Sequence, residues 1–148
     1  MDANGSVRAK RAVAYGMAVV FAAVGTVFLV APGSVIAFFN GLSGPLGFLP
    51  APVFGASLYS ALAAAYMYVV TVLAWNMARR PEEAVFSRLL VHAKLASALV
   101  SLGLFAVCRP YLVLLANGII DGFIGASVLI WFRRRGSAAR TGPGRREG

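Results

Sequence analysis

The chain has 148 residues, of which 59% are hydrophobic and only 13% are charged, and its formal net charge is +9. Soluble globular domains carry roughly 25% charged residues, so this composition excludes an ordinary soluble domain and favours a membrane protein. Most basic residues flank apolar segments and are not interleaved with aromatic residues, which argues against nucleic acid as a partner. The single cysteine, Cys108, excludes an internal disulfide and a CxxC redox pair.

Four long apolar segments follow one another along the chain. They cover residues from about 12–31, 53–77, 84–107 and 111–132. Each reaches the roughly 20 residues that a helix needs to cross a hydrocarbon core of about 30 Å. The sequence therefore predicts an all-α integral membrane protein, with four transmembrane helices in a left-handed antiparallel bundle.

The distribution of arginine and lysine predicts the orientation of these helices. Basic residues lie in segments 1–11, 79–80 and 133–148, whereas Arg109 stands alone on the opposite side. Both termini are therefore expected in the cytoplasm, and a bacterial inner membrane is the natural location. We expect residues 133–148 to be disordered and to bind anionic lipid headgroups. A cleaved signal peptide is the competing interpretation of the first segment, but the length of its apolar run and the position of Pro32 argue against it.

The first outer loop, residues 32–52, contains no charge. Its four prolines and four glycines argue against a long helix, while Phe38, Phe39 and Phe48 make it apolar. Two interpretations remain open. The loop lies in the headgroup interface with a short helix through residues 34–40, or it forms a lid over a cavity between the helices.

Small residues at helical spacing predict where the helices pack, because close backbone approach drives helix association in lipid. Such residues recur on three of the four segments and fit either contacts within the bundle or contacts with a second copy or another membrane protein. They are Ser57, Ala61 and Ala65 on the second segment, Ala93, Ser97 and Ser101 on the third, and Gly118, Gly122 and Ala126 on the fourth.

Two charged residues, Lys94 and Asp121, lie near the middle of the last two segments. A lone charge there costs about 2.5–3.5 kcal/mol, so each needs a partner. At 1.5 Å per residue, Lys94 lies about 21 Å and Asp121 about 16 Å from the outer turn. A lysine side chain can span that offset, although the lean of side chains toward the helix N-terminus widens the gap. Ser97, which is level with Asp121, is an alternative bridge.

The pair has two interpretations. It is either a structural contact that fixes the helix register or an ion- or proton-linked site in a wet cavity. Other polar side chains share the faces of the two charges or lie at similar depth, and we expect the two tyrosines among them to join the polar interior because their hydroxyl groups need partners. These candidates are Asn117, Ser97, Ser101, Tyr66 and Tyr68.

His92, only two residues from Lys94, lies on another face of its helix and is expected to be hydrogen-bonded or interfacial. Haem ligation would need a second histidine, which only a homodimer supplies. We find no nucleophile–base pair, metal cluster or phosphate-binding loop, so the sequence predicts neither a catalytic residue nor a cofactor.

The plan of four spans, with a Gly/Pro-rich outer loop after the first, resembles the DoxX-like proteins in architecture, and this resemblance assigns no role to any residue. Small multidrug-resistance transporters rely on an acidic residue in the first span, quinone-linked thiol oxidoreductases of the vitamin K epoxide reductase type need a CxxC motif, and four-helix cytochromes need paired histidines. This chain lacks all three features.

The sequence thus favours a non-catalytic membrane component, such as a subunit, scaffold or assembly factor. A small ion- or proton-coupled transporter that uses Asp121 and Lys94 is the alternative. A membrane enzyme, or a protein that binds a quinone or lipid, is a third class.

Overall fold

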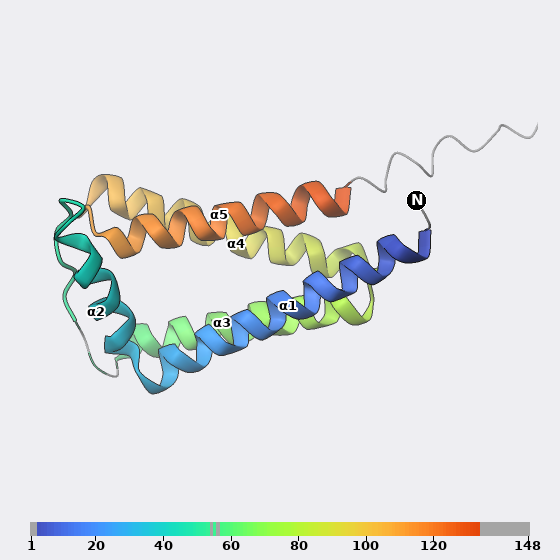
Figure 1. The fold of residues 1–148 in the computed structure, drawn as a ribbon, viewed down its shortest axis with the longest axis horizontal. Helices are drawn as coiled ribbons and strands as arrows, with labels where there is room; N and C mark the ends of the chain where they lie inside the picture. The colour runs from blue at the N-terminus through green and yellow to red at the C-terminus, as the bar shows by residue number, and fades with distance from the viewer. Residues whose placement is uncertain (1–2, 54, 56, 134–148) are drawn as a thin grey trace, which may run out of the picture.

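The computed structural model describes residues 3–53, 55 and 57–133, and helices dominate this part of the chain (Figure 1). Four helices are long and apolar enough to cross a membrane, so their length and composition identify a multi-pass membrane protein. The five helices in chain order are α1 (Ala3–Val30), α2 (Pro32–Ser43), α3 (Leu58–Arg79), α4 (Ala84–Val107) and α5 (Leu112–Arg133).

Local sequence signals account for several helix boundaries. Ser57 caps α3: its hydroxyl accepts a hydrogen bond from the Ser60 amide, and the Ser60 hydroxyl accepts one from the Ser57 amide. Helix α2 is longer than the short helix expected over residues 34–40. It starts at Pro32, where the missing N–H of proline costs no hydrogen bond. Helix α1 also extends back into the basic segment 1–11, which we expected to precede it.

The four long helices form two pairs. Helix α1 packs against α3 and α4 packs against α5, whereas the two pairs meet mainly through α3 and α4. Figure 1 shows the pairs close together at the end with the connection between α3 and α4, and diverging toward the end spanned by α2. We call these the Arg80 end and the α2 end. Helix α2 contacts both α1 and α5 and therefore crosses from one pair to the other.

Glycines bring the helices of each pair close together. A Cβ atom added at Gly25 of α1 would lie 2.9 Å from the Cβ of Met67 on α3. In the other pair, a Cβ at Gly118 would lie 2.6 Å from Leu102, and one at Gly125 would lie 3.0 Å from Leu95. The absence of these side chains permits the close backbone contact that stabilises helix pairs in lipid.

Three of the small residues expected at helix contacts lie outside the contacts within the bundle. Ala61 and Ala65 are exposed on the outer surface of α3, and Ala126 is exposed on α5. On α5 the packing instead runs through Gly118, Gly122 and Gly125. Helix α3 packs within the bundle through its opposite face, which is lined by larger side chains as well as alanines. Its buried residues are Met67, Val70, Ala74, Met77 and Ala78. The stripe of Ala61 and Ala65 is left to the other expected use, a contact with a second copy or another membrane protein.

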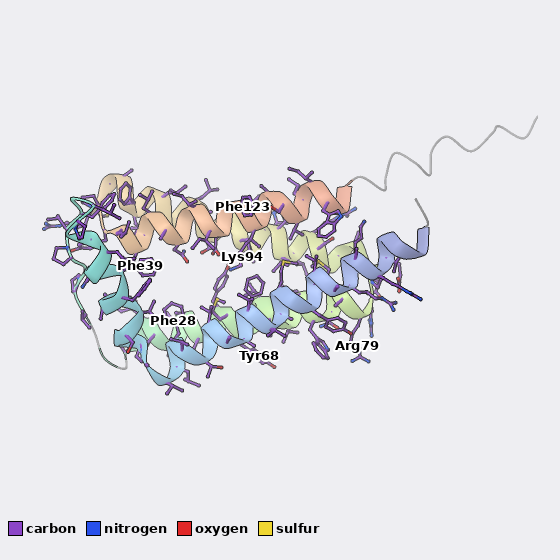
Figure 2. All side chains as sticks on the ribbon, in the orientation of Figure 1. Phe28, Phe39, Tyr68, Arg79, Lys94 and Phe123 are labelled. Atoms are coloured by element: carbon purple, nitrogen blue, oxygen red, sulfur yellow. The ribbon has the colours of Figure 1, made fainter. Side chains whose placement is uncertain are left out.

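The buried apolar core lies mainly toward the Arg80 end. All four long helices contribute to it, and Met77, Leu90 and Val70 are among its largest fully buried side chains. By contrast, large apolar side chains such as Tyr68 and Phe123 lie on the outside of the helix pairs, where this chain does not cover them (Figure 2). This surface fits hydrocarbon and not water, as a membrane protein requires.

The segment after α2 is held in place by polar and aromatic contacts. The Asn40 side chain donates to the carbonyl of Ala51 and accepts from its amide, both at 2.7 Å. Leu49 forms a β-bridge with Tyr111, and the rings of Phe48 and Phe105 lie 6.0 Å apart. The outer loop therefore combines a helix with an extended segment fastened to the end of the α4–α5 pair.

Replacing Gly25 by alanine is expected to lower the free energy of unfolding by about 1–3 kcal/mol. The new Cβ would meet the Cβ of Met67, which cannot move without its backbone. Gly16→Ala in the same helix is the matched control, because nothing lies within 4 Å of a Cβ at that position. Thermal unfolding of both variants in one detergent measures the difference, and equal melting temperatures would contradict the close contact of α1 with α3.

Candidate functional site

A buried ion pair joins α4 and α5. The Nζ of Lys94 lies 2.8 Å from the Oδ1 of Asp121, and the two side chains are only 3% and 6% exposed. Figure 2 shows Lys94 between the two helix pairs. The lysine side chain spans the offset in depth that the sequence indicated, so Ser97 is not needed as a bridge. The pair is the closest contact of opposite charges among the described residues.

Aromatic rings from the other two long helices cover the ammonium group. Its Nζ lies 4.5 Å from the ring centre of Phe21 on α1 and 5.2 Å from that of Tyr66 on α3. Ring faces attract a cation within about 6 Å, and the attraction is strongest where water is excluded. The other three long helices therefore each contribute one side chain to the surroundings of the charge on α4.

Phe21 was not a candidate in the sequence. The spacing along α1 could have indicated Phe21, because this residue lies on the same helix face as Ala14 and Ala18, which are buried. The decisive information is the pairing of α1 with α3, which sets this face above the ammonium group and which the residue pattern of α1 does not contain.

Of the two tyrosines expected in the polar interior, only Tyr66 lies there. The Tyr66 hydroxyl donates to the backbone carbonyl of Ala93 on α4 at 3.0 Å, so this residue links the two helix pairs. Tyr68 is 71% exposed on the outer surface of α3. Residues two apart point about 200° away from each other on a helix, so the two side chains cannot share one face.

A second polar layer lies one helical turn from the ion pair, toward the α2 end. The amide nitrogen of Asn117 on α5 donates to the hydroxyl of Ser101 at 2.8 Å and to that of Ser97 at 3.4 Å. Ser101 is buried and Ser97 is half-buried, whereas Asn117 is exposed. The polar candidates on α4 and α5 therefore form two adjacent layers at one seam.

His92 lies outside these layers. It is exposed on α4, while Lys94, two residues away, is buried. Within the described part of the chain, no three His, Cys, Asp or Glu side chains gather as a metal site would require. Cys108 is a free, exposed thiol at the turn between α4 and α5.

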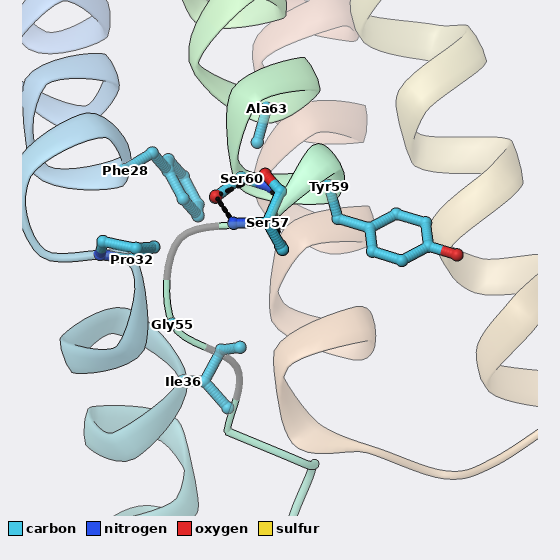
Figure 3. Close-up of a pocket in the computed structure, with 8 residues that line it drawn as sticks. All are labelled: Phe28, Pro32, Ile36, Gly55, Ser57, Tyr59, Ser60 and Ala63. Carbon is cyan, nitrogen blue, oxygen red and sulfur yellow. Dashed lines mark hydrogen bonds between the residues drawn. The ribbon is translucent and has the colours of Figure 1, made fainter.

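A pocket of about 130 Å³ opens at the α2 end, where α1, α2 and α3 meet (Figure 3). Its wall is mostly apolar, and the hydroxyl groups of Ser57 and Ser60 are occupied by the helix cap. Ser57, expected as a packing residue, thus serves as a cap at the edge of this pocket. The remaining lining residues are Phe28, Pro32, Ile36, Gly55, Tyr59 and Ala63.

Comparisons with known proteins assign the chain to no family. No protein-family model, curated protein or solved structure matches the chain. The features of the chain that bear on function are the ion pair, the polar layer beside it and the arrangement of the helix pairs.

Lys94→Met and Asp121→Asn are each expected to lower the free energy of unfolding by about 3–5 kcal/mol, because each leaves a buried charge without its partner. The double variant should recover most of that loss. Thermal unfolding in detergent measures the cycle. The exposed pair Arg80–Glu83, at 3.4 Å, is the control, and its neutralisation should change stability by about 0–1 kcal/mol. Strictly additive losses at Lys94 and Asp121 would contradict a direct structural pair.

Proposed function

We propose that this chain is a non-catalytic component of a membrane, acting as a subunit, scaffold or assembly factor. The observation that supports the proposal is the enclosure of the Lys94–Asp121 pair. Its 2.8 Å contact, its burial and its aromatic cover match a charge pair that fixes one arrangement of helices. A substrate site needs access to its charged groups, and these two groups are almost fully covered.

The broad apolar exterior supports an interaction role. Helices α3, α4 and α5 expose large side chains away from the pair, among them Tyr68, Leu99 and Phe123. Lipid covers such a surface in an isolated molecule, and a membrane partner or a second copy can replace that lipid. In this role the ion pair keeps the exterior in one shape.

We further propose that both termini face the cytoplasm of a bacterial cell and that the membrane is the inner one. The arginines and lysines in the first turns of α1, at the connection between α3 and α4 and after α5 support this orientation. The basic tail from residue 134 lies outside the described residues, and its proposed contact with anionic headgroups rests on its charge alone.

A small ion- or proton-coupled transporter is the second candidate. The observation that favours it is the polar layer of Asn117, Ser97 and Ser101, which continues from Asp121 toward the α2 end. Polar side chains inside a membrane span often line the route of an ion or proton. In such a carrier Asp121 and Lys94 would take part in binding the transported ion or proton.

Proton flux distinguishes the two candidates. The protein is reconstituted in liposomes that contain a pH-sensitive dye, and a pH step is applied. For a non-catalytic component, the native protein and the Lys94→Met, Asp121→Asn double variant should give the same flux as protein-free liposomes. A flux that the native protein carries and the double variant loses would overturn our first proposal in favour of the carrier.

Fusions at two positions test the orientation. Green fluorescent protein attached after Gly148 should fluoresce in a bacterial host, because it folds in the cytoplasm. Alkaline phosphatase inserted after Arg109 should be active, because it needs an oxidising compartment outside the inner membrane. Exchanging the two reporters supplies the control, and the opposite pattern of signals would reverse the proposed topology.

A further inference from the structure

Asn117 is exposed although it lies on an interior face of its helix. It precedes Asp121 by four residues, so the two side chains share a face. Farther toward the Arg80 end, the same face carries Val128, and both Asp121 and Val128 are buried. Asn117 is therefore exposed to the space between the helix pairs and not to the outside of the bundle.

The Asn117 side chain is only partly satisfied. Its nitrogen donates to two serine hydroxyl groups, while its oxygen accepts no hydrogen bond from any described residue. Hydrocarbon offers no hydrogen-bond donor, and an unsatisfied polar group in the bilayer core costs several kcal/mol. The amide oxygen therefore requires a donor from outside the described chain.

On α1 and α3, the buried residues end at the depth of the ion pair. On α1, Ala14, Ala18 and Phe21 are buried, whereas Phe28 nearer the α2 end is only half-buried. On α3, buried residues run from Met67 to the Arg80 end, and toward the α2 end none of the described residues is buried. The ion pair thus marks the boundary between a closed half of the molecule and an open half.

We propose that the space between the two helix pairs at the α2 end is a water-filled vestibule, which ends at Asn117 and the Lys94–Asp121 pair. Water fits this space best, because it can donate a hydrogen bond to the amide oxygen of Asn117 and can hydrate the hydroxyl of Tyr59. Tyr59 is 77% exposed at the start of α3 and lines the pocket of Figure 3. Helix α2 crosses the mouth of the vestibule from one helix pair to the other.

Lipid chains would fill the same space less favourably. A hydrocarbon chain cannot accept or donate a hydrogen bond, so it would leave Asn117 unsatisfied beside a buried ion pair. The far side of the pair has no comparable route, because Leu90, Val91 and Val128 close it with buried apolar side chains. The vestibule therefore brings water to Asn117 from one side only, while the covered charges of Lys94 and Asp121 lie beyond it. This inference goes beyond the proposed function, and it holds for a scaffold as well as for a carrier.

Cysteine labelling in native membranes or liposomes tests the vestibule. In a Cys108→Ser background, Asn117→Cys and Ala63→Cys are treated with the cationic reagent MTSET, which reacts with thiolates and hence with cysteines in water. Each has a matched control two residues away on the lipid-facing side of the same helix, namely Ile119→Cys and Ala61→Cys. We expect both vestibule positions to react about tenfold or more faster than their controls, and Val128→Cys to stay unreactive.

Two outcomes would overturn the inference. If Asn117→Cys reacts no faster than Ile119→Cys, the space at the ion pair is dry, even when Ala63→Cys reacts at the mouth. If Val128→Cys reacts as fast as Asn117→Cys, water passes the pair and the closed half does not exist. Should Asn117→Cys fail to fold, Ser97→Cys replaces it with Leu99→Cys as its control, because serine and cysteine have nearly the same shape.

Discussion

The contact between Lys94 and Asp121 is the constraint on which the arrangement of the long helices depends. Lipid is as apolar as the helices, so burial of hydrophobic surface does little to hold them together. A charged side chain near the middle of the bilayer, in contrast, strongly favours a helix arrangement that places an opposite charge beside it. Asp121 neutralises the ammonium group directly, and Phe21 and Tyr66 cover it from the opposite pair. One charge thus fixes the register of α4 with α5 and the position of α1 and α3 above them.

The two ends of the molecule differ because different contacts hold them. Toward the Arg80 end, buried side chains from all four long helices fill the space between the pairs. Toward the α2 end, the glycine contacts between α4 and α5 still hold that pair together, but little joins it to α1 and α3 except α2 and the segment after it. One protein can therefore combine a structural ion pair with the vestibule that we propose, because the pair lies where the vestibule ends.

The sequence predicts the number of long apolar helices, because length and apolar composition determine them locally, but it places the starts of α1 and α3 several residues from where they lie. It also singles out Lys94 and Asp121, since charges at mid-span are rare. It fails at Tyr68, which lies on the outer face of α3, and it does not tell that Ala61 and Ala65 lie on that same face. In lipid both faces of a helix are apolar, so no change in polarity marks the inner one. The role of Phe21 depends on the pairing of α1 with α3. That pairing cannot be predicted from the residues of either helix alone.

The ion pair lies within one hairpin, and this has a consequence for biosynthesis. Helices α4 and α5 follow each other directly and make extensive contact. The charge on Asp121 can therefore meet Lys94 as soon as the second helix emerges, without waiting for the first pair to dock. The hairpin then enters the bilayer as a nearly neutral unit, and the cost of inserting two separate charges is avoided. Assembly of the whole protein then consists of docking this hairpin against α1 and α3, so that Phe21 and Tyr66 cover a charge that is already paired.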